Sequence, residues 1–331
     1  MSHTGRIDIR AIALDAIHHG AGTDGNTVTL RRQEVLLPDG SIDTVPFVSG
    51  NSLRHLIRDA GVRFALEAMG IAPNSLSKPV VDLLFSGGSL GGKASMTLAK
   101  ARRIAELFPI LSLLGYSAGT RITGGRLEVW NLHLVAEQNL FRRPETIGAD
   151  HPRWRLDGNA QVGSQFGTRH DAARIAHAAS YLAIEDQRAG QLIADAPKGK
   201  GKAPKDEAST QMIYDWEVVL PGAEFHGGIV YRALKEGELS ALASALSHAC
   251  DGRAPDGGYL YRVGAKSGTG HGRMSWHFSG LQRPIATPAM TPSDALLPAI
   301  SDGHQERLDA YREHLVRHRA DILAELEEVS A

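Results

Sequence analysis

The order in which two hydrophobic periodicities follow one another is the feature that most constrains the fold of this chain. Residues 7–17, IDIRAIALDAI, place Ile7, Ile9, Ala11 and Ala13 on one face, as a strand does. Further along, the same patterns predict a helix, two strands, a second helix and a last strand, over residues 49–70, 124–136, 212–233, 236–249 and 272–280. Strand, helix, strand, strand, helix, strand is the order of the ferredoxin-like split βαβ fold, the scaffold of the RRM. That scaffold hosts many unrelated activities, so the order predicts a fold and leaves the function open.

Two insertions interrupt this order. Residues 71–119 have helical patterns and end in the apolar run AELFPILSLLG. Residues 137–210 are polar and charged, and contain KGKGKAPK, a composition that favours a mobile loop. The sequence therefore predicts an α+β protein. We expect an RRM/ferredoxin-like core with a C-terminal amphipathic helix, a helical insertion and a polar insertion, with core segments at residues 1–70, 120–136 and 211–331.

Composition removes several classes of protein. The 331 residues are 42% hydrophobic and 22% charged, which is typical of a globular protein. Within the chain, the polar stretch over residues 18–44 is expected to be a loop. The sequence has no apolar run of membrane-spanning length and no signal-peptide pattern, so we expect a cytoplasmic protein without a membrane partner. Cys250 is the only cysteine, which excludes an internal disulfide and a CxxC metal knuckle. The formal net charge is −1, so a polyanion-binding surface must be a local patch.

A glycine-rich, basic stretch, VGAKSGTGHGRM, precedes the last predicted strand. It carries Lys266, Ser267, His271 and Arg273 between four glycines. Glycine allows positive φ and close backbone approach, so such a loop can present N–H groups and cationic side chains to phosphate. The alternative is a hairpin that only turns the chain.

The start of the first predicted helix offers a second phosphate-binding feature. Ser49 or Asn51 is a typical N-cap residue, and a helix N-terminus presents free N–H groups and positive dipole. Arg54 and Arg58 are four residues apart, so they lie on one helix face that could grip successive phosphates. The alternative is a capped core helix whose arginines are merely solvated. Arg31 and Arg32 could add contacts, although neighbouring residues on a strand point in opposite directions.

Three motifs, in order, resemble the RAMP superfamily of CRISPR proteins. They are VPFVSGNSLRHLIRDAG at residues 45–61, YDWEVVLPGAEFHGGIVYRA at residues 214–233, and the glycine-rich loop. The helical insertion and the SGN form of the first motif most resemble the backbone subunit that coats guide RNA in class 1 effector complexes, with the type IV form closest and type I possible.

The resemblance implies a partner set and a set of contacts. The partners are crRNA, target DNA or RNA paired with the guide, other copies in a helical filament, and other effector subunits. The polar insertion corresponds to the thumb, which folds over RNA held by a neighbouring protomer. RNA-binding residues are then expected at Asn26, Arg31, Arg32, Ser49, Asn51, Ser52, Arg54, His55, Arg58, Gln165, Phe166, Arg169, Lys200, Lys202, Lys266, Ser267, His271 and Arg273.

The resemblance also bears on catalysis. Related subunits that cut target RNA use an aspartate where this chain has Asn26, and an amide is neither a general base nor a carboxylate metal ligand. We therefore expect no catalytic residue, metal or cofactor, although Asp24 lies only two residues away. An alternative is a RAMP-type endoribonuclease using His18 or His19 as acid and base. A remote alternative is a P-loop NTPase at GGSLGGKAS, where Ala94 replaces the Ser or Thr that would bind Mg²⁺.

Overall fold

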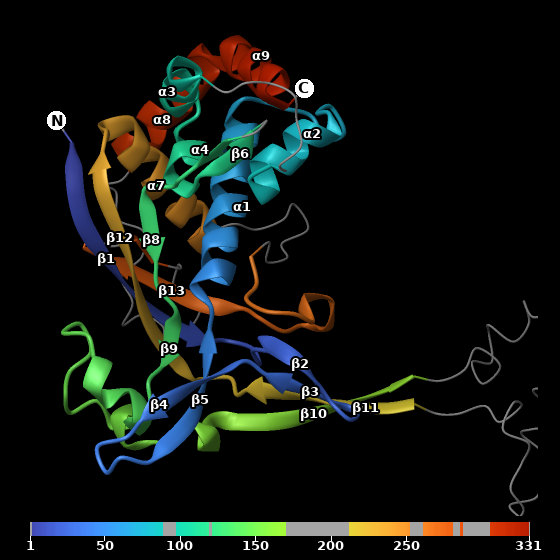
Figure 1. Cartoon of the computed structure of the whole chain (residues 1–331), viewed down its shortest axis with the longest axis vertical. Coiled ribbons are helices and arrows are strands. Elements are labelled where there is room, and N and C mark those ends of the chain that lie inside the picture. The colour runs from blue at the N-terminus through green and yellow to red at the C-terminus, as the bar shows by residue number, and fades with distance from the viewer. Residues whose placement is uncertain are drawn as a thin grey trace, which may run out of the picture.

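The computed structural model shows a mixed α+β protein built around several sheets (Figure 1). It describes residues 2–88, 97–118, 121–169, 212–251, 261–280, 285–286 and 305–330. Within these ranges, none of the helices combines the length and apolarity that crossing a bilayer requires.

The main sheet has eight strands, in the order β14-β13-β1-β12-β9-β5-β4, with β8 also paired to β12. Their bounds are β1 His3–Ala13, β4 Arg32–Leu36, β5 Ile42–Val48, β8 Leu127–Val129, β9 Leu132–Leu134, β12 Glu224–Leu234, β13 Met274–Ser279 and β14 Ile285–Ala286. The predicted alternation along β1 is present, because Ile7, Ile9, Ala11 and Ala13 are buried while the residues between them are not. The strand ends at Ala13, earlier than expected.

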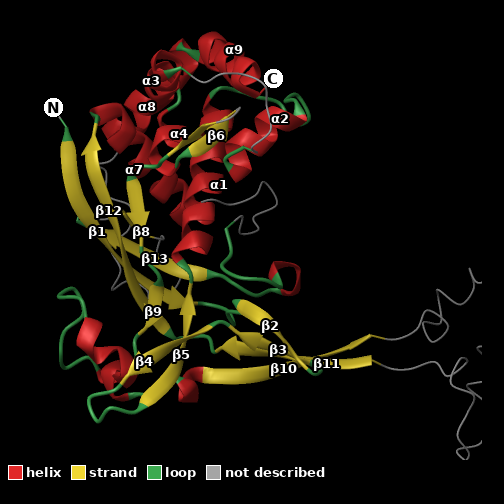
Figure 2. Cartoon of the chain, viewed as in Figure 1, coloured by secondary structure: helices red, strands yellow, loops and turns green. Residues whose placement is uncertain are grey.

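Two long helices cover one face of this sheet (Figure 2). They are α1 (Gly50–Ala68) and α7 (Glu236–Asp251), at the two predicted positions. Ile57 and Ala60 of α1 and Leu242 and Leu246 of α7 are fully buried in the core that the helices share with β1 and β12. The hydrophobic face of each helix therefore explains its position.

The helical insertion and the C-terminal helices lie together at one end of the molecule (Figure 1). The insertion contains α2 Lys78–Val81, the π-helical turn η1 Asp82–Ser86, α3 Leu98–Leu107, α4 Pro109–Leu114 and the strand β6 Tyr116–Ala118, and the strand β7 Arg121–Thr123 that pairs with β6 follows it. The single C-terminal helix predicted at residues 304–328 is two helices, α8 Gln305–Arg317 and α9 Arg319–Ser330. Arg103 of α3 bonds Glu325 of α9 at 2.7 Å, which fastens the end of the chain to the insertion.

A second, four-stranded sheet corrects two sequence expectations. Its order is β10-β11-β3-β2, with bounds β2 Gly20–Asp24, β3 Thr27–Leu30, β10 Val162–Arg169 and β11 Met212–Val219. The stretch over residues 18–44, expected to be a loop, instead contains β2, β3, β4 and the start of β5. Its strands are short and separated by Gly, Asp and Asn turns, so its alternation is hard to detect. The break expected at the Pro-Gly of residues 212–233 is present, where Gly222 has φ +85°. The two halves of this segment, counted as one strand of the predicted core, instead join different sheets.

Three short 3₁₀ helices pack beside β9 and β12. They are η2 Glu137–Arg142, η3 Pro152–Arg155 and η4 Asn159–Gln161. Trp154 of η3 is buried, and its ring lies 5.6 Å from that of His226 on β12. The first part of the polar insertion is thus packed on the main sheet.

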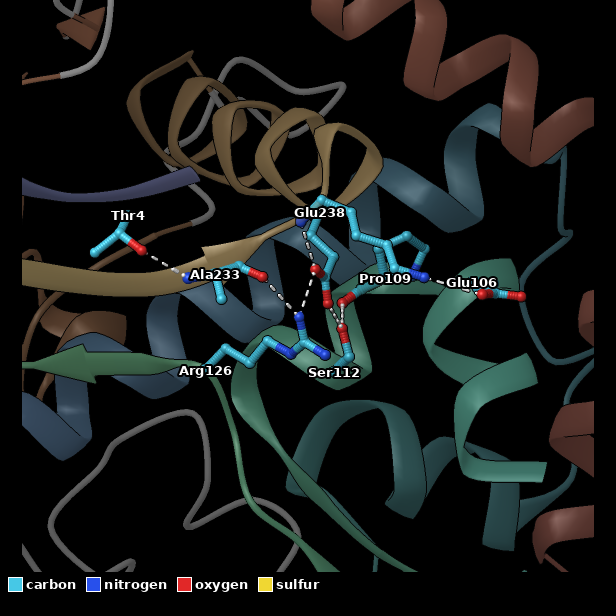
Figure 3. Close-up of polar contacts among 8 residues, drawn as sticks. Thr4, Glu106, Pro109, Ser112, Arg126, Ala233 and Glu238 are labelled. Carbon is cyan, nitrogen blue, oxygen red and sulfur yellow. Dashed lines mark hydrogen bonds and ion pairs between the residues drawn. The ribbon is translucent and has the colours of Figure 1, made fainter. Parts of the chain in front are cut away.

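A buried carboxylate joins α7 to the insertion (Figure 3). Glu238 is 3% exposed and accepts hydrogen bonds from Ser112 Oγ at 2.7 Å, from an Arg126 guanidinium N–H at 3.0 Å and from the Lys235 backbone N–H at 2.8 Å. The last bond is one half of a capping box. In this motif the side chain of the third helical residue accepts a hydrogen bond from the backbone N–H of the residue that precedes the helix, here Lys235. Arg126 also donates to the carbonyl oxygen of Ala233 at 3.0 Å. The charge of Glu238 is therefore compensated on several sides.

Candidate functional site

A cavity of about 770 Å³ lies where the start of α1, the β2–β3 hairpin and the glycine-rich loop meet. Two features that the sequence predicted as phosphate-binding therefore line one cavity. Its lining residues are His18, His19, Gly20, Gly22, Val28, Arg31, Ser49, Asn51, Ser52, His55, Leu56, Asp59, Tyr261, Arg262, Val263, Gly264 and Ala265.

The first wall is the N-terminus of α1. Ser49 is its N-cap residue, with extended φ and ψ of −68° and 142°, and its side chain accepts a hydrogen bond from the backbone N–H of Ser52. The Ser49 N–H donates to His19 Nε2 at 3.2 Å, and the Gly50 N–H donates to Asn131 Oδ1 at 2.8 Å. The expectation of free N–H groups is therefore wrong at these three positions. Side chains occupy them because the helix start lies beside the residues that directly precede β2 and β9, His19 and Asn131.

Two adjacent histidines connect the walls. His18 is 2% exposed, and its Nδ1–H donates to the carbonyl oxygen of Glu217 at 2.6 Å. His19 reaches the cavity, where burial first and the charge of Arg31 second lower its pKa below the usual value. Its imidazole is therefore neutral at pH 7, as its role as acceptor for Ser49 requires.

The second wall is the first half of the glycine-rich loop. The Ala265 N–H donates to the carbonyl oxygen of His18 at 2.8 Å, which ties the loop to the chain just beyond β1. Gly264 has φ +83°, and a Cβ atom there would lie 2.3 Å from that same oxygen. The position requires glycine, because both the backbone conformation and the close approach exclude a side chain.

The basic side chains of this loop bind protein groups, in contrast to the expected phosphate contacts. Lys266 Nζ lies 3.6 Å from the ring centroid of Trp216 on β11. His271 is 7% exposed, and its Nε2 is 2.6 Å from Gln165 Oε1 on β10. Both contacts fasten the loop to the second sheet. Only Ser267, in the 3₁₀ turn η6 Ser267–Thr269, is left exposed among the predicted loop contacts.

Arg273 forms a bidentate ion pair with Asp15. The Nε–O and NH2–O distances are 2.6 and 2.7 Å, and this hydrogen bonding holds the pKa of Asp15 below its usual value. Arg262 also reaches Asp15, at 3.4 Å. Arg262 and Arg273, at the two ends of the glycine-rich loop, therefore both bind Asp15 and stabilise the ends of the loop.

The two arginines of α1 that were expected to grip phosphates, Arg54 and Arg58, bind backbone carbonyl oxygens of the protein instead. Arg58 is 7% exposed and donates to the carbonyl oxygens of Gly115 at 2.6 Å and Leu114 at 3.3 Å. Arg54 donates to Leu127 O at 2.8 Å and also to Leu114 O. Burial, and then the charge of Arg54, lower the pKa of Arg58 to about 10. The two guanidinium groups cap the C-terminal carbonyls of α4, where a positive charge is favourable.

The side chains of Arg31 and Arg32 point in opposite directions, as expected for neighbouring residues in extended chain. Arg32 pairs with Glu217 at 3.0 Å and also bonds Asn159. Arg31 is exposed and lines the cavity. Asn51 and His55 are likewise exposed on the cavity wall. The cavity therefore keeps three of the predicted polar contacts available to a ligand.

The other predicted contacts lie elsewhere. Asn26 is exposed in the β2–β3 turn and is not part of the cavity lining. Phe166 on β10 is 72% exposed. The side chain of Arg169, together with Lys200 and Lys202, lies outside the described residues, as does most of GGSLGGKAS. Within the described ranges, no three His, Cys, Asp or Glu side chains are grouped so that they could hold a metal ion.

Several lining residues were missed by sequence reasoning, and four of them show what the sequence could and could not have indicated. They are Val28, Asp59, Tyr261 and Arg262. Asp59 follows Asn51 and His55 at helical spacing, so it could have been placed on their face. Val28 was concealed by the expectation of a loop. Nothing in YLYRVGA distinguishes its second tyrosine as a cavity residue.

Comparison with known proteins agrees with the motifs. Residues 8–81 match the sequence model of the family described as CRISPR-associated negative auto-regulator DevR/Csa2. No curated protein sequence matches the chain. A chain of the solved structure titled "Type IV-B CRISPR Complex" is 19% identical and has a TM-score of 0.51, covering 86% of this chain and 95% of that one. Residues 8–81 are thus similar to the DevR/Csa2 family, and the fold of the chain is shared with a chain of a type IV-B CRISPR complex.

Proposed function

We propose that this chain binds guide crRNA along its backbone, as the repeating subunit of a class 1 CRISPR effector complex closest to type IV. The observation that carries the proposal is the cavity with Arg31, Asn51 and His55 exposed on its wall. The segment that matches the DevR/Csa2 family, residues 8–81, contains all three of them. In this role the bound guide is presented for pairing with target DNA or RNA.

The strand order supports the proposed scaffold. In the main sheet, β13, β1, β12 and β9 are neighbours in that order, and they come from the four strands predicted for the split βαβ core. The helices α1 and α7 lie on the same face (Figure 2). This arrangement is the one proposed for an RRM-like core.

The second sheet supports the proposed self-association. Figure 1 shows β10 and β11 reaching away from the body of the molecule, and Phe166 on β10 is 72% exposed. A large exposed aromatic side chain on a projecting element suits contact with another protomer or its RNA. We propose that this hairpin is the base of the thumb, which acts between neighbours in a helical filament that also binds other effector subunits.

The proposed role is binding without catalysis or cofactor. His19 Nε2 already accepts a hydrogen bond from Ser49, and the Nδ1–H of His18 is held by Glu217. Asn26, with its uncharged amide, lies in the β2–β3 turn. These contacts argue against the endoribonuclease alternative, which would use one of these histidines as acid and base.

Fluorescence anisotropy with single-stranded RNA at several salt concentrations tests the proposal. Contacts to about four phosphates per protomer predict a log–log slope of about −3, from ~0.7 per contact. Affinity should vary little with base sequence, and guide-bound protein with Mg²⁺ should leave complementary RNA intact. A flat salt response would contradict guide binding, and regularly spaced target fragments would contradict the absence of cleavage.

A further inference from the structure

We propose that the cavity receives one nucleobase of the bound strand, while the adjoining phosphate stays outside at Arg31. The inference rests on the proposed function and goes beyond it, because contact with the backbone alone does not require any base to enter the protein.

The shape of the cavity favours a base. Its volume of about 770 Å³ is within the range of about 300–1,000 Å³ that is usual for small-ligand pockets. The lining includes residues that belong to the core, since Leu56, Tyr261 and Val263 are only 6%, 6% and 4% exposed. An apolar floor stabilises a planar base and offers no compensation for the lost hydration of a phosphate.

The charges of the lining favour the phosphate and the base of a nucleotide at different places in the cavity. Arg31 is the exposed cation, whereas Arg262 pairs with Asp15 at 3.4 Å and donates to the carbonyl oxygen of His271 at 3.0 Å. The carboxylate of Asp59 lines the cavity and accepts two hydrogen bonds of 3.1 Å from Arg63. A phosphate near Asp59 would be repelled, but a neutral base with N–H groups would find an acceptor there.

A buried hydroxyl supplies an independent observation. Tyr261 lines the cavity, and its hydroxyl oxygen has no hydrogen-bond partner among the described residues. A buried hydroxyl without a partner is unfavourable. Burial first, and the charge of Asp59 second, raise the pKa of Tyr261, so the phenol stays protonated and can donate to a base carbonyl or ring nitrogen. The hydroxyl oxygen is itself buried, so a bound base would pair it after the Tyr261 ring turns toward the cavity.

The test compares two strands on the whole chain by fluorescence anisotropy. One is a 15-nucleotide uridine RNA, and the other is a ribose-phosphate strand of the same length without bases. We expect the abasic strand to bind at least about tenfold more weakly, which corresponds to roughly 1.4 kcal/mol. Tyr261→Phe should weaken binding of the uridine strand several-fold and leave binding of the abasic strand unchanged.

A cavity-filling variant locates the effect. Gly22 lines the cavity and a Cβ there would meet no atom within 4 Å, so Gly22→Trp adds a large side chain to the cavity wall without a clash at Cβ. This variant should bind both strands with the low affinity of the abasic strand. Gly124→Trp is the matched control, since Gly124 is equally open but lies outside the cavity, and it should bind both strands like the unmodified protein.

The outcomes distinguish the two proposals. Equal affinity for both strands in the unmodified protein would overturn the base pocket and leave guide binding intact. A difference between strands that persists in Gly22→Trp would place base recognition elsewhere and also overturn it. If the uridine strand itself fails to bind, the proposed function fails and the base pocket fails with it.

Discussion

Two polar regions of this protein differ in how completely their groups are paired. Around Glu238, a hydroxyl, a guanidinium group and a backbone N–H all donate to one buried carboxylate (Figure 3). In the cavity beside α1, Arg31 is exposed and the hydroxyl of the buried Tyr261 is unpaired among the described residues.

The difference separates structural polar groups from groups available for binding. A buried charge with a complete set of partners holds elements together, and removing one partner is costly. A polar cavity whose groups lack protein partners can pair them with a ligand instead. On this criterion Arg54, Arg58, His271 and Arg273 are structural, whereas Arg31 is available to a ligand.

The largest effect is expected at the paired region. Glu238→Ala removes the acceptor that Ser112, Arg126 and the Lys235 backbone N–H share, although Ser112 keeps the carbonyl oxygen of Pro109 and Arg126 keeps that of Ala233. Because each hydrogen bond to a charged group contributes about 1.5–3 kcal/mol, the free energy of unfolding should fall by about 3–5 kcal/mol, measured by urea denaturation. Glu236→Ala, two residues earlier, removes a carboxylate with 58% side-chain exposure and should cost less than about 1 kcal/mol. Equal losses of stability in Glu238→Ala and Glu236→Ala would show that the buried, fully paired carboxylate is no more important for stability than an exposed one.

Acid should destabilise the protein through buried histidines on the other face of the main sheet. Burial first and the charge of Arg142 second lower the pKa of His133 to about 3 and that of His226 to about 4, from 6.5. The unfolded chain takes up these protons below pH 6.5 and the folded chain does not, so stability is complete above pH 6.5 and falls as the pH approaches 4. At about 1.4 kcal/mol per pH unit for each histidine, unfolding measured at pH 7 and pH 5 should differ by up to roughly 4 kcal/mol.

The double variant His133→Asn, His226→Asn is the control for that pH dependence. Whatever its absolute stability, its free energy of unfolding should change less between pH 7 and pH 5 than that of the unmodified protein. An unchanged dependence would assign the effect to other groups.

A smaller loss of stability is expected at the arginines of α1. Arg58→Met keeps the length of the side chain but removes the donor to the carbonyl oxygen of Gly115 and leaves that of Leu114 with Arg54 alone. The free energy of unfolding should fall by about 2–3 kcal/mol, with RNA affinity retained in the folded protein. Arg63→Met removes a more exposed guanidinium, paired with Asp59, on the same helix and should change stability by less than about 1 kcal/mol. If Arg58→Met folded normally and lost RNA binding, the original phosphate assignment would be correct.

The smallest effect distinguishes two neighbouring arginines. Arg31→Ala should lower affinity for single-stranded RNA about three- to tenfold and reduce the salt slope by ~0.7, because one phosphate contact is lost. Its stability should stay within about 0.5 kcal/mol of the unmodified protein. Arg32→Ala removes the contact with Glu217 and should instead cost about 1 kcal/mol of stability, with an unchanged salt slope. The reverse result would exchange the roles of the pair.

The strands and helices of the core could be predicted because each has its own periodicity. The alternation of Ile7, Ile9 and Ala11 and the helical spacing of Leu53, Leu56 and Ile57 need no knowledge of distant contacts. Strands as short as Thr27–Leu30, between Gly and Asn turns, gave no comparable signal.

The role of each basic residue could not be predicted, because it depends on partners far away in the sequence. Arg273 is bound by Asp15, and Arg58 by carbonyl oxygens that end a helix of the insertion. The composition of the loop is the same whether Lys266 points to RNA or lies on Trp216. Only the tertiary structure distinguishes these alternatives.

Photo-cross-linking of RNA that contains 4-thiouridine, followed by mass spectrometry, tests the central claim most directly. The account predicts cross-links to the peptides that line the cavity, within residues 18–31, 49–59 and 261–270, and their loss in Gly22→Trp but not in Gly124→Trp. Cross-links confined to the helical insertion or to the outer face of β1, with none in the cavity peptides, would contradict it.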